Sequence, residues 1–413
     1  HKAIRRQRQM CIRDRYGEAK RKMKKVVATA GAVVERYGFE EIETPIFEFT
    51  EVFARNLGDT SDIVTKEMYC FEDRGGESLT LRPEGTAGVV RSFVSEGMQQ
   101  NLPVKLYYAG PMFRYERPQK GRQRQFTQFG VELLGVETPQ ADIEVIAMAY
   151  EFIESLGLEG NVTVEINSLG DAESRTAYRE KLVAYLQAHY NELSEDSKNR
   201  LERNPLRVLD SKEECDKAVV AGAPLYQDSL NPASKDFFAA VLKGLDLLGI
   251  KYRVNNRLVR GLDYYSHTVF ELVTDKLGAQ GTVLAGGRYD GLVEQMGGGK
   301  VAGIGWACGV ERLSMLLEAD VSLPRPVAVI PVGEDVADRA LEISCRLRRA
   351  GFRVEHSYSG NLKKRMVKAN KANAVKAVIL GSDELAQNVA TLKDLDSGAQ
   401  KTVSLSNLIE ELK

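Results

Sequence analysis

Residues 110–132, GPMFRYERPQKGRQRQFTQFGVE, combine side chains that could bind an anionic ligand. Polar and apolar residues alternate on both sides of a loop, which predicts a two-strand hairpin with one polar face. That face presents guanidinium, carboxylate, ring and amide groups: Arg114 and Glu116 before the loop, and Phe126, Gln128 and Glu132 after it. Alternating polar residues on an antiparallel strand often mark only a solvated face, so this pattern alone leaves both interpretations open.

The loop between the two predicted strands is cationic. Lys120, Arg122 and Arg124 surround Gly121, a residue typical of turns. Because lysine and arginine form charge-assisted hydrogen bonds to phosphate oxygens, the loop suits a mobile arm that contacts phosphates.

Two more segments place a charged or aromatic group beside a glycine. In SLTLRPEGTAGVVRSFV, an alternating strand enters a Pro-Glu-Gly turn ahead of a helix, so Glu84 fits either a helix-start carboxylate facing the dipole or a ligand contact. In RGLDYYSHTVFE, Arg260 precedes a tyrosine pair. If the strand is regular, Tyr264 and Tyr265 point to opposite faces, one into the core and the other toward a ligand.

Two glycine-rich segments follow in the sequence. GGRYDG contains Tyr289 and, taken alone, is more typical of a hairpin turn than of a ligand site. VAGIGWACGVERLSMLLEA predicts a small-residue strand entering a helix, with Arg312 in the first turn of that helix. An arginine at the positive end of a helix suits a phosphate group, although GxGxxxG before a helix also fits plain close packing.

Several elements must position these groups. Apolar residues at helical spacing predict a first helix from Gly17, which Gly38 ends. Residues of about 172–250 are helical and charged and predict a small helical insertion. After a proline-containing linker, residues 326–413 alternate strand and helix, which predicts a compact α/β domain. Its segment NLKKRMVKANKANAVK holds six Lys or Arg, a pattern of either a solvated helix face or an RNA-phosphate contact.

Composition limits the function classes. A chain of 413 residues exceeds the usual size of a single core, so more than one domain is expected. A net charge of −1 and a pI of about 6.6 restrict nucleic-acid contacts to local basic patches. Five cysteines without CxxC pairs and four histidines predict a reduced, cytoplasmic protein without structural zinc. No apolar stretch predicts a membrane span or a secretory signal. The opening HKAIRRQRQMCIRDR is densely basic and aperiodic, so residues 1–15 are a candidate for a foreign or mis-joined end.

Taken in order, these segments resemble the three motifs of the class II aminoacyl-tRNA synthetases. FRYERPQKGR resembles the histidyl version of motif 2, RGLDYY and GGRYDG resemble histidyl-specific motifs, and VAGIGWACGVERL resembles motif 3. EEIETPIFEFTEVFARN, in which Pro45 interrupts the strand pattern, is similar to motif 1, where the family builds its dimer interface. The resemblance covers about residues 17–413.

The resemblance implies a fold and an activity. The fold is an α+β catalytic domain with an antiparallel sheet over residues 16–322, the helical insertion at about 172–250, which lies over the tRNA acceptor stem, and a C-terminal α/β anticodon-binding domain over 326–413. The activity is ATP-dependent attachment of L-histidine to tRNA(His) through histidyl-adenylate, with release of AMP and pyrophosphate. A homodimer and Mg²⁺ bridging the ATP phosphates are also implied.

Roles are implied for the residues that match the family motifs. The catalytic residues are Arg260, Arg114 and Gln128. Histidine is bound by Glu84, Thr86, Gln128, Glu132, Arg260, Tyr264, Tyr265 and Tyr289. ATP is bound by Arg114, Glu116, Arg122, Phe126 and Arg312. The tRNA is bound by Gln119, Lys120, Arg124, Lys363, Lys364 and Arg365, and no metal ligand is assigned.

Two other classes compete with this assignment. Non-catalytic paralogues of the fold act as regulatory subunits of the first enzyme of histidine biosynthesis, but they typically lack the anticodon-binding domain and parts of the ligand motifs. Here the C-terminal domain is present together with Arg114, Arg260 and Arg312. A class II ligase for another amino acid is disfavoured by RGLDYY and GGRYDG.

Overall fold

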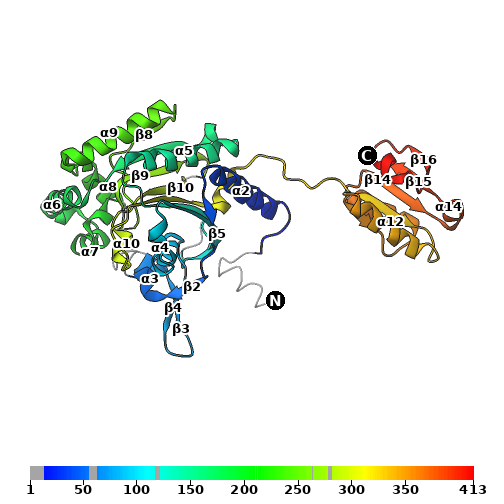
Figure 1. Ribbon diagram of the computed structural model, residues 1–413, viewed down its shortest axis with the longest axis horizontal. Coiled ribbons are helices and arrows are strands. Elements are labelled where there is room, and N and C mark those ends of the chain that lie inside the picture. Colours follow the sequence, from blue (N-terminus) through cyan, green and yellow to red (C-terminus); the bar gives the residue numbers. More distant parts are fainter. Residues whose placement is uncertain are drawn as a thin grey trace. The chain divides into compact units, whose positions relative to one another are not determined.

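The computed structural model describes residues 14–54, 63–116, 121–209, 211, 213–262, 264–277 and 281–413. They form two compact units, one ending at Val321 and the other spanning Ser322–Lys413 (Figure 1). Each unit has its own sheet and its own core.

An eight-stranded sheet forms the centre of the first unit, in the order β1-β5-β6-β11-β10-β9-β7-β8. Every pairing is antiparallel except β1 with β5 and β7 with β8. The strands are β1 Glu40–Glu41, β5 Val104–Phe113, β6 Gln125–Leu134, β7 Thr163–Ser168, β8 Tyr252–Val254, β9 Ser266–Val273, β10 Thr282–Arg288 and β11 Gly303–Gly309.

Helices and a second sheet surround this centre. One face of the large sheet packs in a core with α2 Gly17–Arg36, α5 Pro139–Ser155, α9 Pro232–Leu247 and α11 Val310–Leu316. A three-stranded antiparallel sheet, β2 Phe47–Phe49, β4 Ser78–Leu81 and β3 Tyr69–Glu72, projects from the unit (Figure 1). The short elements beside them are α3 Thr50–Ala54, η1 Ile63–Glu67, α4 Thr86–Ser95, η2 Met98–Asn101, η3 Glu159–Asn161, η7 Asp275–Leu277 and α10 Leu292–Gln295.

The predicted first helix is confirmed as α2. Its apolar positions are buried, and it ends just before Gly38, which adopts φ +79°. A left-handed conformation at this point is accessible to glycine without steric cost, which explains why the helix stops there.

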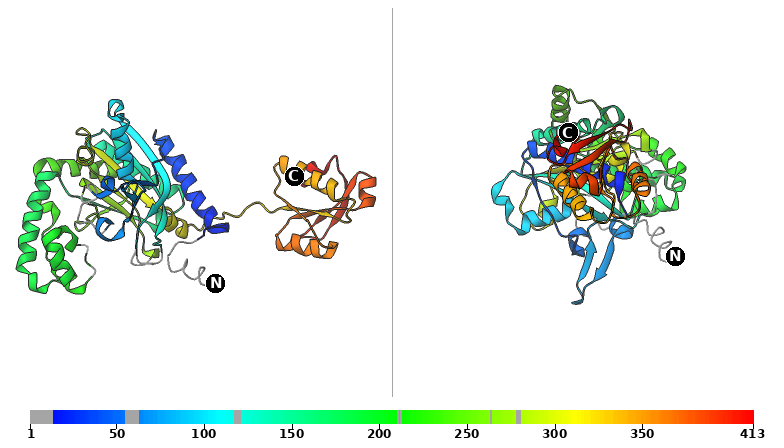
Figure 2. Two further views of the ribbon diagram at one scale, coloured as in Figure 1. Left: turned by 90° about the horizontal axis from the view of Figure 1, so that it is seen from below. Right: turned by 90° about the vertical axis from the view of Figure 1, so that its right-hand side faces the viewer.

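The helical insertion stands at one end of the sheet, as the green helices in the left view of Figure 2 show. It contains α6 Ala172–Ala188, η4 Tyr190–Glu192, α7 Glu195–Arg203, η5 Pro205–Val208, α8 Glu214–Ala221, η6 Tyr226–Ser229 and α9. The side chains of Asp171, Ser194 and Asn231 cap α6, α7 and α9. Each accepts a hydrogen bond from the backbone amide three residues further along the chain. The last helix, α9, packs on α5 and β9 and so joins the insertion to the sheet.

The second unit is an α/β layer with the strand order β13-β12-β14-β15-β16. The first three strands are parallel, and β15 and β16 are antiparallel additions. Its elements are β12 Val327–Pro331, α12 Ala337–Arg349, β13 Val354–His356, α13 Leu362–Lys371, β14 Lys376–Leu380, α14 Ser382–Ala386, β15 Val389–Asp394, β16 Gln400–Ser404 and α15 Leu408–Leu412. The predicted α+β architecture with a C-terminal α/β domain is confirmed.

Candidate functional site

The predicted hairpin is the β5–β6 pair. These strands are antiparallel, with Phe113 opposite Gln125, and the alternation divides β6 between two environments. Phe129 and Val131 are buried in the core beneath the sheet, whereas Phe126 and Gln128 line a cavity on the other face. The period of two therefore separates core from site as predicted.

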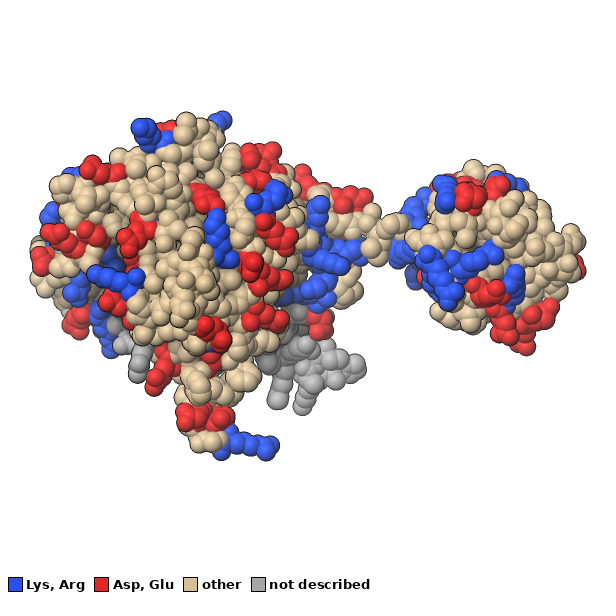
Figure 3. Space-filling model, viewed as in Figure 1, with Lys and Arg blue, Asp and Glu red and all other residues tan. Residues whose placement is uncertain are grey.

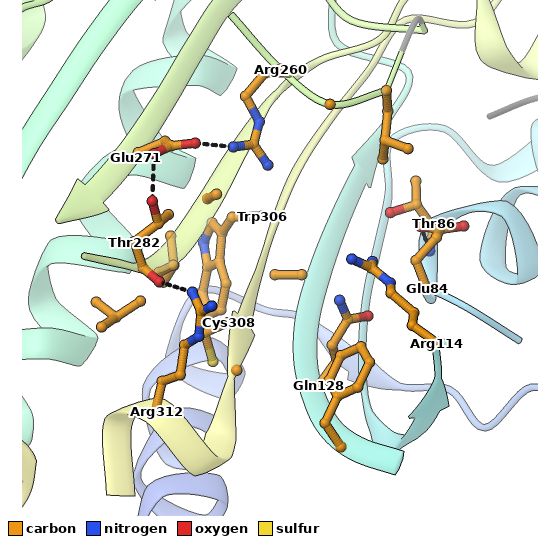
Figure 4. Close-up of a pocket in the computed structure, with 18 of the residues that line it drawn as sticks. Glu84, Thr86, Arg114, Gln128, Arg260, Glu271, Thr282, Trp306, Cys308 and Arg312 are labelled. Atoms are coloured by element: carbon orange, nitrogen blue, oxygen red, sulfur yellow. Dashed lines mark hydrogen bonds and ion pairs between the residues drawn. The ribbon is translucent and has the colours of Figure 1, made fainter. Parts of the chain in front are cut away.

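A cavity of about 370 Å³ lies on this face of the sheet (Figure 4). Every residue that the sequence assigned to catalysis, histidine or ATP lines it: Glu84, Thr86, Arg114, Glu116, Arg122, Phe126, Gln128, Glu132, Arg260, Tyr264, Tyr265, Tyr289 and Arg312. Segments more than 200 residues apart in the sequence thus meet in one place.

Glu132 lies at the buried end of the cavity. Its carboxylate accepts hydrogen bonds from Thr86 Oγ1 at 2.7 Å and from the hydroxyl of Tyr289. Burial raises the pKa of Glu132 to about 8 against the opposing effect of these two hydrogen bonds. On the neighbouring strand β11, a Cβ at Gly305 would lie 2.2 Å from Glu132 Oε2, so the carboxylate requires a glycine there.

Glu84 lies at the start of α4. Its two carboxylate oxygens accept hydrogen bonds from the amides of Thr86 and Ala87, both at 2.8 Å. The helix-start interpretation of Glu84 therefore holds, and the same side chain also borders the cavity. Burial raises its pKa, whereas the hydrogen bonds to these amides favour the charged form.

Three tyrosine rings form an aromatic wall beside Glu132. Tyr264 lies 4.6 Å from Tyr265 and 5.7 Å from Tyr289 between ring centroids, and all three are buried. The prediction that one of Tyr264 and Tyr265 packs away from the ligand is wrong, because both line the cavity. The two residues precede β9, which begins at Ser266, so strand alternation does not apply to them.

Arg260 enters the cavity from the segment before β9. It forms an ion pair with Glu271, and its guanidinium lies 5.5 Å from the centre of the Tyr265 ring. Glu271 also accepts a hydrogen bond from Thr282 Oγ1 at 2.7 Å, which fixes the carboxylate (Figure 4). Arg260 thus forms an ion pair with a residue of the sheet and still lies at the cavity wall.

Three arginines surround the other end of the cavity. Arg122 pairs with Glu116 at 3.1 Å, and Arg114 lies over the Phe126 ring at 5.4 Å. Arg312, in the first turn of α11, donates a hydrogen bond to the Thr282 carbonyl at 2.5 Å. Burial, followed by repulsion from Arg122, lowers the pKa of Arg312, so this end of the cavity favours an anion.

The predicted tRNA contacts are divided between the two units. Gln119 and Lys120 lie outside the described residues, and Arg124 stacks over the Tyr115 ring at 3.8 Å. In the second unit, Lys363 and Lys364 are exposed at the start of α13, whereas Arg365 is partly buried and donates a hydrogen bond to the Pro331 carbonyl. Basic and acidic side chains are interspersed over the first unit (Figure 3), as expected from a near-neutral chain.

Several cavity residues were not assigned from the sequence: Glu271, Thr282, Trp306, Cys308 and Glu311. Glu271 ends the segment RGLDYYSHTVFE, which begins with Arg260, and Glu311 precedes Arg312, so their presence in motifs with an assigned arginine was the available signal. Glu311 accepts hydrogen bonds from the Thr127 amide and pairs with Arg15 at 2.7 Å, which joins α11 to β6 and to residue 15 of the basic opening segment.

Within the described residues, no group of three or more His, Cys, Asp or Glu side chains could hold a metal ion. None of the helices in the described part of the chain is long and apolar enough to cross a membrane.

The antiparallel sheet, the hairpin with its arginines and Arg312 in the first turn of α11 define a class II aminoacyl-tRNA synthetase architecture. The family model described as histidyl-tRNA synthetase matches residues 11–313, and an anticodon binding domain model matches residues 326–413. The chain belongs to the histidyl-tRNA synthetase family.

Relatives with this name match the chain over nearly its whole length. The histidine–tRNA ligase of Rhodospirillum rubrum is 60% identical over 400 residues, 97% of this chain and 96% of the relative. That of Gluconacetobacter diazotrophicus is 55% identical over 392 residues, covering 95% and 94%. The crystal structure of apo histidyl-tRNA synthetase from S. aureus superimposes with a TM-score of 0.80 at 36% identity, covering 97% of both chains.

Proposed function

We propose that the chain is a histidine–tRNA ligase. The observation that carries the proposal is one cavity with two chemically different ends. A buried carboxylate and three tyrosine rings lie at one end, suited to an imidazole, and Arg114, Arg122 and Arg312 lie at the other, suited to a triphosphate. The name of the relatives and their full-length match support the same activity.

The first step would join histidine to ATP. A carboxylate oxygen of histidine attacks the α-phosphorus of ATP, a new O–P bond forms, and the bond to the β-phosphate oxygen breaks to release pyrophosphate. Arg260 and Arg114 would stabilise the charge that develops on the α-phosphate, because a guanidinium keeps its charge at any working pH. Arg122 and Arg312 would hold the outer phosphates, Glu116 would contact ATP, and Phe126 would stack on the adenine.

Selection of histidine would depend on the buried end of the cavity. Glu132 and Tyr265 would form hydrogen bonds with the imidazole, next to Tyr264 and Tyr289. A site that satisfies its polar groups only with the correct substrate rejects apolar analogues strongly, because they leave those groups unpaired. The α-ammonium would contact Glu84, Thr86 and Gln128. In support of this, the Gln128 Oε1 atom is buried and has no hydrogen-bond partner among the described residues.

Mg²⁺ would accompany ATP. The ion takes oxygen ligands, commonly one or two carboxylates together with substrate phosphates. Glu271 and Glu311 line the cavity and could complete such a shell. When bound, the ion would neutralise phosphate charge.

The second step would transfer the histidyl group to the 3′-terminal adenosine of tRNA(His) and release AMP. The cationic arm with Gln119, Lys120 and Arg124 would contact the acceptor end, and Lys363, Lys364 and Arg365 of α13 would contact the anticodon region. Because the reaction needs ATP and tRNA, we place the protein in the cytoplasm.

A homodimer is also part of the proposal. The small sheet β2-β4-β3 exposes an apolar surface, in which Phe47 and Phe49 are 53% and 56% exposed and the Phe47 and Phe71 rings lie 6.4 Å apart. Exposed apolar patches of this kind are typical of interaction sites. The expected partner is a second copy of the chain, which sedimentation of the purified protein would test.

Amino-acid-dependent ATP–pyrophosphate exchange tests the proposal directly. Exchange driven by histidine and by none of the other nineteen amino acids is expected, followed by transfer of labelled histidine to tRNA. Exchange driven by another amino acid would contradict the histidyl assignment. A folded protein with neither activity would favour the regulatory-subunit alternative.

A further inference from the structure

The segment that carries Arg260 is held from outside the sheet by the helical insertion. Residues 255–262 and 264–265, between β8 and β9, have no regular secondary structure. The side chain of Arg257 donates hydrogen bonds to the Ala221 carbonyl at 2.6 Å and to the Ala223 carbonyl at 3.3 Å, both at the end of α8. Gln227 of η6 donates to Asn256 Oδ1 at 2.6 Å. The insertion therefore contacts the beginning of this segment at two places.

A third contact lies directly beside Arg260. The guanidinium of Arg207, in η5, donates a hydrogen bond to the carbonyl of Gly261. A Cβ built at Gly261 would lie 3.3 Å from Arg207 Nη1, so the guanidinium covers this peptide closely. Arg207 and Arg260 also border the same small cavity of about 20 Å³.

The position of Arg207 is itself fixed. Its carbonyl accepts a hydrogen bond from Arg200 Nη1 at 3.1 Å, and its amide donates to the Asn204 carbonyl at 3.0 Å. Val208, the next residue, is fully buried in a core cluster that also contains Tyr265. The insertion and the aromatic wall of the histidine pocket thus share one core.

We propose that Arg207 is a positioning residue for Arg260, and that the helical insertion thereby sets the rate of adenylate formation. The hydrogen bond to the Gly261 carbonyl fixes the peptide between Gly261 and Leu262, one residue beyond Arg260, and so limits the directions of the Arg260 side chain. Preorganisation of a charged donor is what a charge-stabilising site requires, because a displacement of about 1 Å can cost about a hundredfold in rate. The inference rests on the proposed function, since it assigns Arg207 to the same reaction.

The test compares histidine-dependent ATP–pyrophosphate exchange in the full chain and in five variants: R207A, R207K, R260A, the double variant R207A/R260A and the control R203A. Arg203 is an exposed arginine of α7, four residues before Arg207. R207A should lower kcat roughly tenfold with the KM for histidine and ATP within about twofold, R207K should recover part of the loss, and R203A should match the unaltered chain. In the R260A background, R207A should have an effect below about twofold, because a residue that acts through Arg260 has nothing left to position.

Each other result decides against the inference. Equal losses from R207A with and without Arg260 would show that Arg207 acts independently, and an unchanged kcat in R207A would show that the contact is dispensable. If R207A does not fold, as judged by circular dichroism, R207K takes its place. Its effect on kcat is then measured in the unaltered chain and in the R260A background, and the effect in the R260A background should again be below about twofold. Absence of exchange in the unaltered chain would refute both the proposed function and this inference. Normal exchange in both the unaltered chain and R207A would refute only the inference.

Discussion

The buried carboxylate of Glu132 should make the catalytic unit less stable as the pH rises. Its pKa is about 8 in the folded chain and near 4.5 for an ordinary glutamate. Between these values the folded chain holds a proton at Glu132 that the unfolded chain has released, so the contribution of Glu132 to the free energy of unfolding must decrease with increasing pH. The stabilisation is complete below pH 4.5 and is lost as the pH rises through 8.

The size of the effect follows from the same two values. Well below the folded pKa, the loss is about 1.4 kcal/mol per pH unit. Between pH 6 and pH 8 it amounts to about 2 kcal/mol, because the proton is half dissociated at the upper limit. Glu132→Gln removes the titrating group with little change in shape, so this variant should lack that decrease. The free energy of unfolding of the unaltered chain, minus that of the variant, should fall by about 2 kcal/mol between pH 6 and pH 8.

Urea unfolding followed by tryptophan fluorescence measures this difference. The chain has one tryptophan, and Trp306 is 2% exposed on β11, the strand paired with that of Glu132. Its emission therefore reports on the unit that contains the cavity. Glu180→Gln, at an exposed position of α6, is the control and should follow the unaltered chain. Parallel curves for the unaltered chain and Glu132→Gln, within about 0.5 kcal/mol, would refute a buried, protonated Glu132.

Three variants test other parts of the site and the second unit. Arg260→Ala should lower histidine-dependent exchange by about 10²–10³-fold and leave histidine binding, measured by equilibrium dialysis, almost unchanged; normal exchange would remove the role we give this residue. Phe126→Ala should raise the KM for ATP roughly tenfold, since stacking on a base contributes about 1–3 kcal/mol, and a rise in the KM for histidine instead would contradict the stacking role. Replacing Lys363 and Lys364 together by alanine should slow histidine transfer to tRNA and reduce the dependence of that transfer on salt concentration. ATP–pyrophosphate exchange should not change. Loss of exchange as well would argue against a contact confined to tRNA.

Local patterns predicted the elements that hold the site. The alternation in residues 110–132 was sufficient to divide β6 into a core face and a cavity face, because the side chains of a strand alternate with a period of two. The helix at Gly17 followed from its apolar spacing, and its end followed from Gly38. Where the backbone was irregular, the same rule failed. Tyr264 and Tyr265 lie in a turn before β9, and both reach the cavity.

Contacts between distant segments could not be predicted from the sequence. The hydrogen bonds to Glu132 join residues 46 and 157 positions away, and they depend on the position of α4 beside β6 and on how β6, β11 and β10 align. No local pattern specifies that alignment. The same holds for Arg207, since nothing in residues 205–208 indicates that an arginine of the insertion reaches the peptide of Gly261.

GGRYDG shows why resemblance identified one residue of a motif and not its neighbour. Tyr289 faces the cavity, whereas the adjacent Arg288 is fully buried and pairs with Asp142 of α5, 146 positions away. Arg288 also donates hydrogen bonds to the carbonyls of Val136 and Thr138. Removing one member of such a buried pair costs about 3–5 kcal/mol, because it leaves an uncompensated charge. Arg288 therefore holds the end of β10 against α5, and the next residue, Tyr289, lines the cavity. The orientation of Tyr289 thus depends on the Arg288–Asp142 ion pair on the opposite side of the sheet.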